Sequence, residues 1–169
     1  MSDAEAPELP VRPARIRRVL VAGLVVCTVL IGAAGWTDVQ ARRHETARAQ
    51  MVAAGRAGAV ALTTIDHSNV DRDVQRILDS STGAFHDDFA QRAESLKAAA
   101  RTTQSTSVGT VREAGLESAD GDSAQVLVAL TVMTSNRGAP ERQPKSWRTR
   151  VTVTKTDDGF KVAGVEFVP

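Results

Sequence analysis

The chain has 169 residues with 21 Lys+Arg, 20 Asp+Glu, one cysteine and no tyrosine. Four arginines and three acids precede residue 19, so the rest of the chain is electrically balanced. Such a balance argues against nucleic-acid binding, which needs a net basic face. A lone cysteine excludes a disulfide within the chain and a metal site built on cysteines.

Residues 19–36 form one apolar run, VLVAGLVVCTVLIGAAGW, in which only Cys27, Thr28 and Trp36 carry polar side-chain atoms. A helix of this length rises about 27 Å, close to the hydrocarbon thickness of a bilayer. We therefore predict a transmembrane helix over residues 19–36. A cleaved signal peptide and a buried core helix are the alternatives. The first lacks a clean small-x-small cleavage site, and the second would have to be covered on all sides.

The four arginines at positions 12–18 predict the orientation of this helix, because positively charged residues favour the cytoplasmic side. Residues 1–18 are then a disordered cytoplasmic tail, and the C-terminal domain is extracytoplasmic. The expected location is the cell membrane, crossed once.

Two helical stretches are expected before any strand. Residues 37–62 are rich in Ala, Arg and Gln and predict a helical, membrane-proximal connector, which leaves residues 63–169 as an α+β domain. After a break rich in capping residues, apolar residues recur at helical spacing at Val70, Val74, Ile77 and Leu78. A second helix carries its apolar stripe on Phe85, Phe89, Leu96 and Ala100, with Asp87, Asp88, Arg92 and Lys97 largely elsewhere.

From residue 108 the hydrophobic period changes to two, which predicts four strands over 108–118, 124–135, 146–156 and 160–168. Asp-Gly pairs at 120–121 and 158–159 indicate tight hairpins, and residues 136–145, with two prolines, indicate a longer exposed loop. Val126, Val128, Leu130 and Val132 form the buried face of a central strand. The fold class is therefore α+β, with helices packed on one face of a curved four-stranded antiparallel sheet.

The chain offers little catalytic chemistry. Its three histidines are His44, His67 and His86, and it has neither a GxSxG motif nor a nucleotide-binding glycine motif. The run of His86, Asp87 and Asp88 suggests a metal site, but consecutive helical residues do not share a face. We expect a solvated helix surface there. The prediction is a protein that is not an enzyme, with no catalytic, metal or cofactor-binding residues.

Several segments resemble one family. These are DVQRILDSSTGAFHDDF (residues 73–89), DGDSAQVLVALTVMTSN (120–136), GAPERQPKSWR (138–148) and VEFVP (165–169). They are similar to the Mce-associated membrane proteins of actinobacteria, and the resemblance covers residues 19–169. It implies one N-terminal transmembrane helix, an extracytoplasmic domain of the NTF2-like or cystatin-like fold, and an accessory role in Mce systems that import fatty acids or sterols. It supplies no catalytic residues.

The leading hypothesis is an anchored adaptor that stabilises the Mce transport complex through protein–protein contacts, with the bilayer and Mce proteins as partners and no nucleic acid. The alternative is a lipid-binding module with a pocket between helices and sheet, either filled by Phe85, Phe89 and Trp147 or open. A third is an isomerase-type enzyme, which is disfavoured because the chain has no tyrosine to donate to an oxyanion.

Overall fold

The computed structural model describes residues 45–168, and the side chains of all of these except residues 140–143. A helix is described over residues 45–63 (helix 45–63 below). It is followed by β1 (Ile65–Asp66), α2 (Val70–Asp79), α3 (Gly83–Thr103), β2 (Thr106–Asp120), β3 (Ser123–Asn136), β4 (Ala139–Thr156) and β5 (Gly159–Phe167). The α+β class is confirmed. The described helices precede the four long strands as predicted, but the short strand β1 lies between helix 45–63 and α2.

The sheet has five strands in the order β1-β2-β3-β4-β5, each antiparallel to its neighbour, and our prediction of four strands was wrong. The additional strand, β1, is two residues long and pairs Ile65 with Ser107 and Asp66 with Thr106. Two residues are too few for an alternating pattern to stand out from a turn-rich stretch. The central position of β3 is as predicted.

Both Asp-Gly hairpins form, with Gly121 at φ 56° and Gly159 at φ 113°, values that favour glycine. The predicted loop over residues 136–145 is instead a short turn at Arg137 and Gly138, from which β4 continues at once. The Asn136 side-chain oxygen accepts hydrogen bonds from the backbone N–H groups of Gly138 (2.9 Å) and Ala139 (2.8 Å) and holds this turn.

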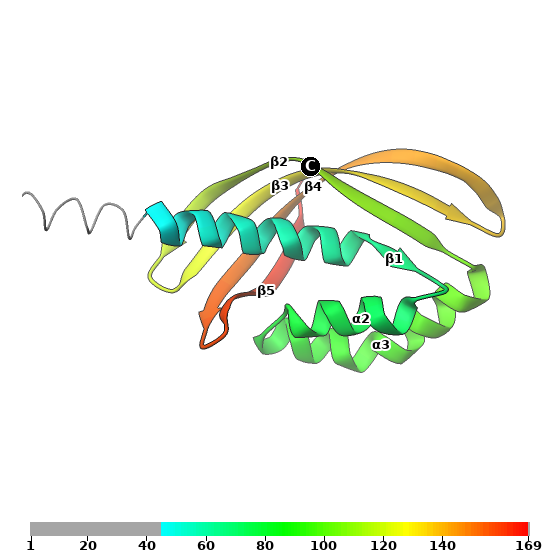
Figure 1. Cartoon of the computed structure of the whole chain (residues 1–169), viewed down its shortest axis with the longest axis horizontal. Coiled ribbons are helices and arrows are strands. Elements are labelled where there is room, and N and C mark those ends of the chain that lie inside the picture. The colour runs from blue at the N-terminus through cyan, green and yellow to red at the C-terminus, as the bar shows by residue number, and fades with distance from the viewer. Residues whose placement is uncertain (1–44, 169) are drawn as a thin grey trace, which may run out of the picture. The chain divides into compact units, whose positions relative to one another are not determined.

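Helix 45–63 lies against the sheet and belongs to the domain core (Figure 1). Val126, Val128, Val151 and Val153 are fully buried at this interface, with Met51 and Ala59 packed against the sheet from the helix. A Cβ on Gly55 would come within 2.7 Å of the Val126 Cβ, so the helix approaches the sheet closely at a glycine. The compact unit begins at Thr46, so most of the segment that we predicted to be a connector is part of the domain.

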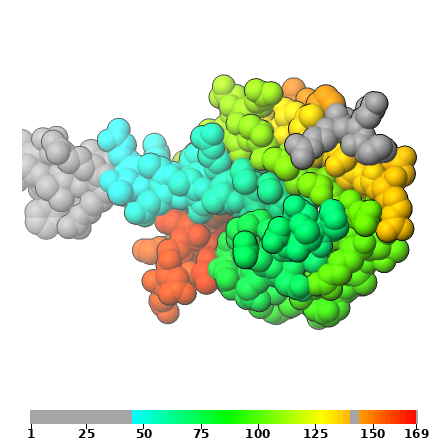
Figure 2. All heavy atoms as spheres, turned by 45° about the vertical axis from the view of Figure 1, so that its right-hand side comes forward, coloured from blue at the N-terminus to red at the C-terminus, as the bar shows by residue number. Residues whose placement is uncertain are grey.

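Helices α2 and α3 form a pair with its own apolar cluster, in which Val70 and Val74 of α2 pack on Ala93 and Ala100 of α3. Lys97 and Arg101 of α3 both form ion pairs with Asp71 of α2. The hydrogen bond from Arg101 is the main reason that the pKa of Asp71 lies below its usual value. Figure 2 shows this pair and helix 45–63 forming one continuous helical surface.

The segment that joins α2 to α3 pairs with the outer edge of β5. Val162 donates its backbone N–H to the Ser80 carbonyl and accepts a hydrogen bond from the Thr82 N–H, both at 2.8 Å. Ser81 and Val162 thus form an isolated parallel bridge. This contact fixes the helical pair to the β5 side of the sheet.

The opposite face of the sheet carries a charge network. The Arg150 guanidinium of β4 reaches Glu117 of β2 with an Nη2–Oε1 distance of 2.9 Å, and Glu166 of β5 at 3.4 Å. The hydrogen bonds from Arg150 hold the pKa of the Glu117 carboxyl below its usual value. Arg150 therefore bridges three strands above Leu127 of β3, which the register places between Gly115 and Arg150.

Within residues 45–168, no helix is both long and apolar enough to cross a membrane. The predicted cytoplasmic tail (1–18) and transmembrane helix (19–36) lie outside the described residues.

Candidate functional site

A pocket of about 350 Å³ opens between helix 45–63, α3 and the β4–β5 side of the sheet. Eleven residues line it, and most are apolar: Ala59, Leu62, Thr63, Phe85, Phe89, Arg92, Leu96, Trp147, Thr149, Val165 and Phe167. Pockets of about 300–1,000 Å³ with mainly hydrophobic and aromatic walls are typical small-molecule sites. This pocket is the candidate functional site.

One wall comes from α3. Phe85, Phe89, Arg92 and Leu96 are spaced by four, three and four residues, so they follow one face of the helix. The rings of Phe85 and Phe89 stack with centroids 6.3 Å apart and planes inclined by 28°. Both phenylalanines remain partly exposed, although they pack beside the two apolar clusters. They therefore line the pocket and leave space between the walls.

The facing wall comes from the sheet. Trp147 and Thr149 alternate along β4, and Val165 and Phe167 alternate along β5, so all four point to the helical side. Phe167 meets Trp147 edge to face, with ring centroids 5.4 Å apart and an interplanar angle of 86°. Phe167 is 70% exposed, whereas phenylalanine is usually buried in the core of a folded protein. An exposed aromatic thus borders the pocket.

The few polar groups in the walls are largely occupied. The Thr63 hydroxyl donates to the Ala59 carbonyl at 2.6 Å, and the Thr149 hydroxyl donates to the Val128 carbonyl at 3.5 Å. Arg92 is the one charged side chain among the lining residues, all of which the structure describes. It is 74% exposed at its side chain, and its Nε donates to the Asp88 carbonyl at 3.1 Å.

Sequence reasoning located part of this site. The sequence left two alternatives, a pocket filled by Phe85, Phe89 and Trp147 or an open one, and in the structure these residues line an open pocket. Arg92 was placed largely away from the apolar face, whereas it lies at the pocket. Leu62, Val165 and Phe167 were missed, although the alternation of Val165 and Phe167 in the last strand was a signal for a shared face.

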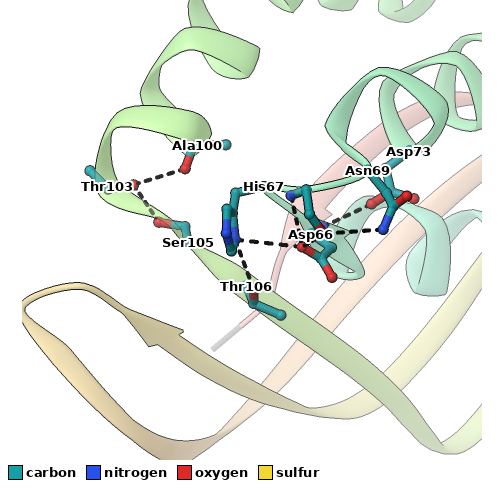
Figure 3. Close-up of polar contacts among 9 residues, drawn as sticks. Asp66, His67, Asn69, Asp73, Ala100, Thr103, Ser105 and Thr106 are labelled. Carbon is teal, nitrogen blue, oxygen red and sulfur yellow. Dashed lines mark hydrogen bonds and ion pairs between the residues drawn. The ribbon is translucent and has the colours of Figure 1, made fainter.

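A second cluster of polar side chains lies where β1 meets α2 (Figure 3). The buried Asp73 carboxylate accepts a hydrogen bond from the Asp66 N–H at 2.8 Å and pairs with Arg76 at 2.9 Å. The Asp66 carboxylate in turn accepts hydrogen bonds from the hydroxyl and from the backbone N–H of Ser68. Both bonds lower the pKa of the Asp66 carboxyl, and the bond from the hydroxyl has the larger effect. The cluster holds the turn before α2, which has no side-chain cap at Asn69.

His67 in this cluster does not form a catalytic triad. Its Nδ1 lies 3.3 Å from the Thr106 hydroxyl oxygen and 3.5 Å from the Asp66 carboxylate. A triad needs the base to contact nucleophile and carboxylate through different ring nitrogens, whereas both contacts here use Nδ1. The arrangement therefore supports the turn and does not activate Thr106.

The other histidines add no site. His86 is half-buried in the first turn of α3 and its Nδ1 lies 3.1 Å from the Asp87 carboxylate, and His44 lies outside the described residues. No group of three or more His, Cys, Asp or Glu side chains within residues 45–168 is arranged to hold a metal ion.

The α+β fold, with helices on one face of a curved antiparallel sheet and a pocket between them, resembles that of NTF2-like domains. A solved NTF2-like protein involved in plasmid conjugation superposes with a TM-score of 0.50 and 13% identity, over 73% of this chain and 49% of that one. An IcmL-like type IV secretion system protein from Legionella pneumophila gives a TM-score of 0.58 and 18% identity, over 72% and 92% of the two chains. The periplasmic domain of DotI gives a TM-score of 0.56 and 14% identity, over 70% of this chain and 92% of that one.

The chain belongs to the Rv1363c/MT1408-like family, whose model, described as uncharacterized protein Rv1363c/MT1408-like, matches residues 14–169. It is 35% identical over 165 residues to the uncharacterized protein Rv1363c of Mycobacterium tuberculosis, covering 95% of this chain and 63% of that protein. The chain thus spans less than two thirds of the length of that relative.

Proposed function

We propose that this protein is a non-enzymatic accessory subunit of an Mce-type lipid import system. In this proposal residues 19–36 anchor it in the cell membrane, and the domain works outside the cytoplasm by binding. The observation that carries the binding function is the open pocket, whose walls combine aromatic side chains with hydroxyl groups already bonded to backbone carbonyls. Such walls suit an apolar group.

The Mce assignment is supported by the sequence resemblance in residues 73–89, 120–136, 138–148 and 165–169. These segments form α2 with the start of α3, strand β3, the start of β4 and the end of β5. Periplasmic placement of a domain with the same fold in DotI is consistent with an extracytoplasmic domain here.

Two binding modes are distinguished by what enters the pocket. In the adaptor mode an apolar side chain of an Mce protein enters, and the subunit stabilises the complex. Anchoring confines both partners to one surface, so a weak contact is sufficient. In the lipid-binding mode an imported lipid enters. The accessible pocket admits either occupant, because Phe85, Phe89 and Trp147 do not fill it.

A deletion strain tests the proposal through uptake of labelled fatty acid or sterol and through the abundance of Mce subunits. The complementing variant Leu96→Arg places a charge in the pocket wall, and Arg72→Gln on the exposed surface of α2 is its control. The adaptor mode predicts that Leu96→Arg lowers both uptake and subunit abundance. The lipid-binding mode predicts lower uptake with normal abundance.

The proposal fails if deletion changes neither uptake nor subunit abundance and no Mce protein co-purifies with the full-length chain. Folding of Leu96→Arg is checked by its protease resistance in isolated membranes, because a misfolded domain would mimic the adaptor result.

A further inference from the structure

The pocket has two chemically different regions. Its walls are apolar and come from Leu62, Phe85, Phe89, Leu96 and Val165 among others, and its single charged lining residue is Arg92. The Thr63 hydroxyl is bonded to the Ala59 carbonyl at 2.6 Å and the Thr149 hydroxyl lies 3.5 Å from the Val128 carbonyl, so a buried polar group of a ligand would find few free donors within these walls. The buried part of a ligand must therefore be hydrocarbon.

Arg92 has unused capacity for an anion. Its Nε is bonded to the Asp88 carbonyl, and its Nη2 lies 3.9 Å from the Asp88 carboxylate, which is at the outer limit of an ion pair. A guanidinium presents five N–H donors, so several remain for a ligand. Arg92 lies three residues after Phe89 and four before Leu96, so its stem is on the pocket stripe, while its side chain is 74% exposed. The cation thus lies where the pocket meets solvent.

The volume limits the size of the hydrocarbon. At about 30 Å³ for each water-sized group, a cavity of about 350 Å³ holds roughly ten to twelve methylenes. This is enough for one acyl chain of medium length, or for the buried part of a longer one.

We infer that the pocket binds a single-chain carboxylate amphiphile, with the hydrocarbon between α3 and the sheet and the carboxylate on Arg92. This inference rests on the lipid-binding mode of the proposed function and gives its ligand class. The charge complementarity of one cation at the opening selects an anionic head, and the volume selects one chain over a bulkier lipid. A fused-ring sterol and an apolar side chain from a partner protein are the competing occupants.

The test uses the full-length chain in lipid nanodiscs and a Trp36→Phe background, which leaves Trp147 as the only tryptophan. Bromine quenches indole fluorescence on close contact, so dodecanoate brominated at its terminal carbon reports occupancy beside Trp147. Dodecanol brominated at the same carbon has the same hydrocarbon chain without the charge. A brominated sterol tests whether the pocket accepts a bulkier ligand. A Trp147→Phe variant that retains Trp36 reports partition into the bilayer.

We expect saturable quenching of Trp147 by the brominated acid, reversed by unlabelled dodecanoate, and binding about fivefold weaker for the alcohol. An exposed charge pair contributes up to about a factor of five. Arg92→Gln should weaken binding of the acid by about this factor and leave the alcohol unchanged. The control Arg72→Gln removes one exposed arginine from α2 and should change neither.

Equal binding of acid and alcohol, or an Arg92→Gln variant that binds the acid normally, would overturn the anion site. Quenching that never saturates, or a preference for the sterol, would overturn the single-chain ligand. Because Arg92 is exposed, its replacement should leave the fold intact, and unchanged circular dichroism would verify this. A saturable acid site in the protein would retain this inference even if deletion changed neither uptake nor Mce subunit abundance and no Mce protein co-purified, a result that would refute the proposed role in Mce import.

Discussion

Leu130 and Leu127 provide a direct test of which face of β3 is buried. They lie three residues apart on the same strand, yet Leu130 is 2% exposed and Leu127 is 38% exposed. The register places Leu130 between Val111 of β2 and Trp147 of β4, beneath the helical layer. Leu127 faces the other side, below the Arg150 network.

Truncation of a buried leucine to alanine costs about 2–5 kcal/mol, because it removes transfer free energy and leaves a cavity. Typical domains have a free energy of unfolding of about 5–15 kcal/mol, so Leu130→Ala should remove a large share of it. The expected fall in melting temperature is on the order of 10 °C for a domain of this size. Leu127→Ala should cost under about 1 kcal/mol, because the side chain is already partly hydrated.

Urea unfolding of the full-length chain in nanodiscs, followed by Trp147 fluorescence in the Trp36→Phe background, measures both variants. Unchanged slopes with a lower midpoint would attribute the loss to native stability. Equal losses for the two leucines, or a larger loss for Leu127→Ala, would refute the facing of β3. Leu130→Asp is the extreme case and should prevent folding, because its carboxylate would be buried without a partner.

Three further predictions use the same unfolding assay or uptake. Gly55→Ala should destabilise the domain by about 1–3 kcal/mol through overpacking, whereas Gly115→Ala, where an added Cβ meets nothing within 4 Å, should be neutral or stabilising. The folded-state pKa of Glu117 is depressed, so the contribution of the Arg150 pair is present above the unfolded value of 4.5 and is lost as pH falls through the folded value. Glu117→Gln should therefore reduce the loss of stability on acidification below pH about 4.5, and an unchanged acid profile would contradict this pairing. His86→Ala should leave melting temperature and uptake unchanged, and loss of uptake with the fold retained would restore the metal hypothesis.

The sequence predicted the parts of the fold whose signals are local. Alternation identified β3 and its buried face, and the Asp-Gly pairs marked two turns, because side-chain period and turn chemistry act over a few residues. β1 was missed because two residues cannot show a period. The start of β4 was missed because prolines and charges there resemble a loop. The edge of β4 that faces β5 is paired only from Thr149 onward. Pro144 therefore lies where this edge is unpaired, and proline is tolerated there.

The site was less predictable than the fold. Helical spacing showed that Phe85, Phe89 and Leu96 share a face, but an open pocket depends on the separation of α3 from the sheet. That separation depends on tertiary contacts such as the pairing of Val162 with the α2–α3 segment. Arg92 was difficult for a related reason, since charged residues beside an apolar stripe are usually solvated.

The exposed edges of the sheet affect whether neighbouring copies of the protein can pair with one another when they are close together. An exposed strand edge is a template on which another chain can pair and begin aggregation. Here the middle of β5 is occupied by its bridge to Ser81, and β2 beyond β1 is interrupted by register shifts at Val111/Glu113 and Leu116/Ser118. The unpaired part of β4 carries Pro144 and Lys145, which disfavour added strands. Many copies can therefore be held close together without their sheets joining edge to edge.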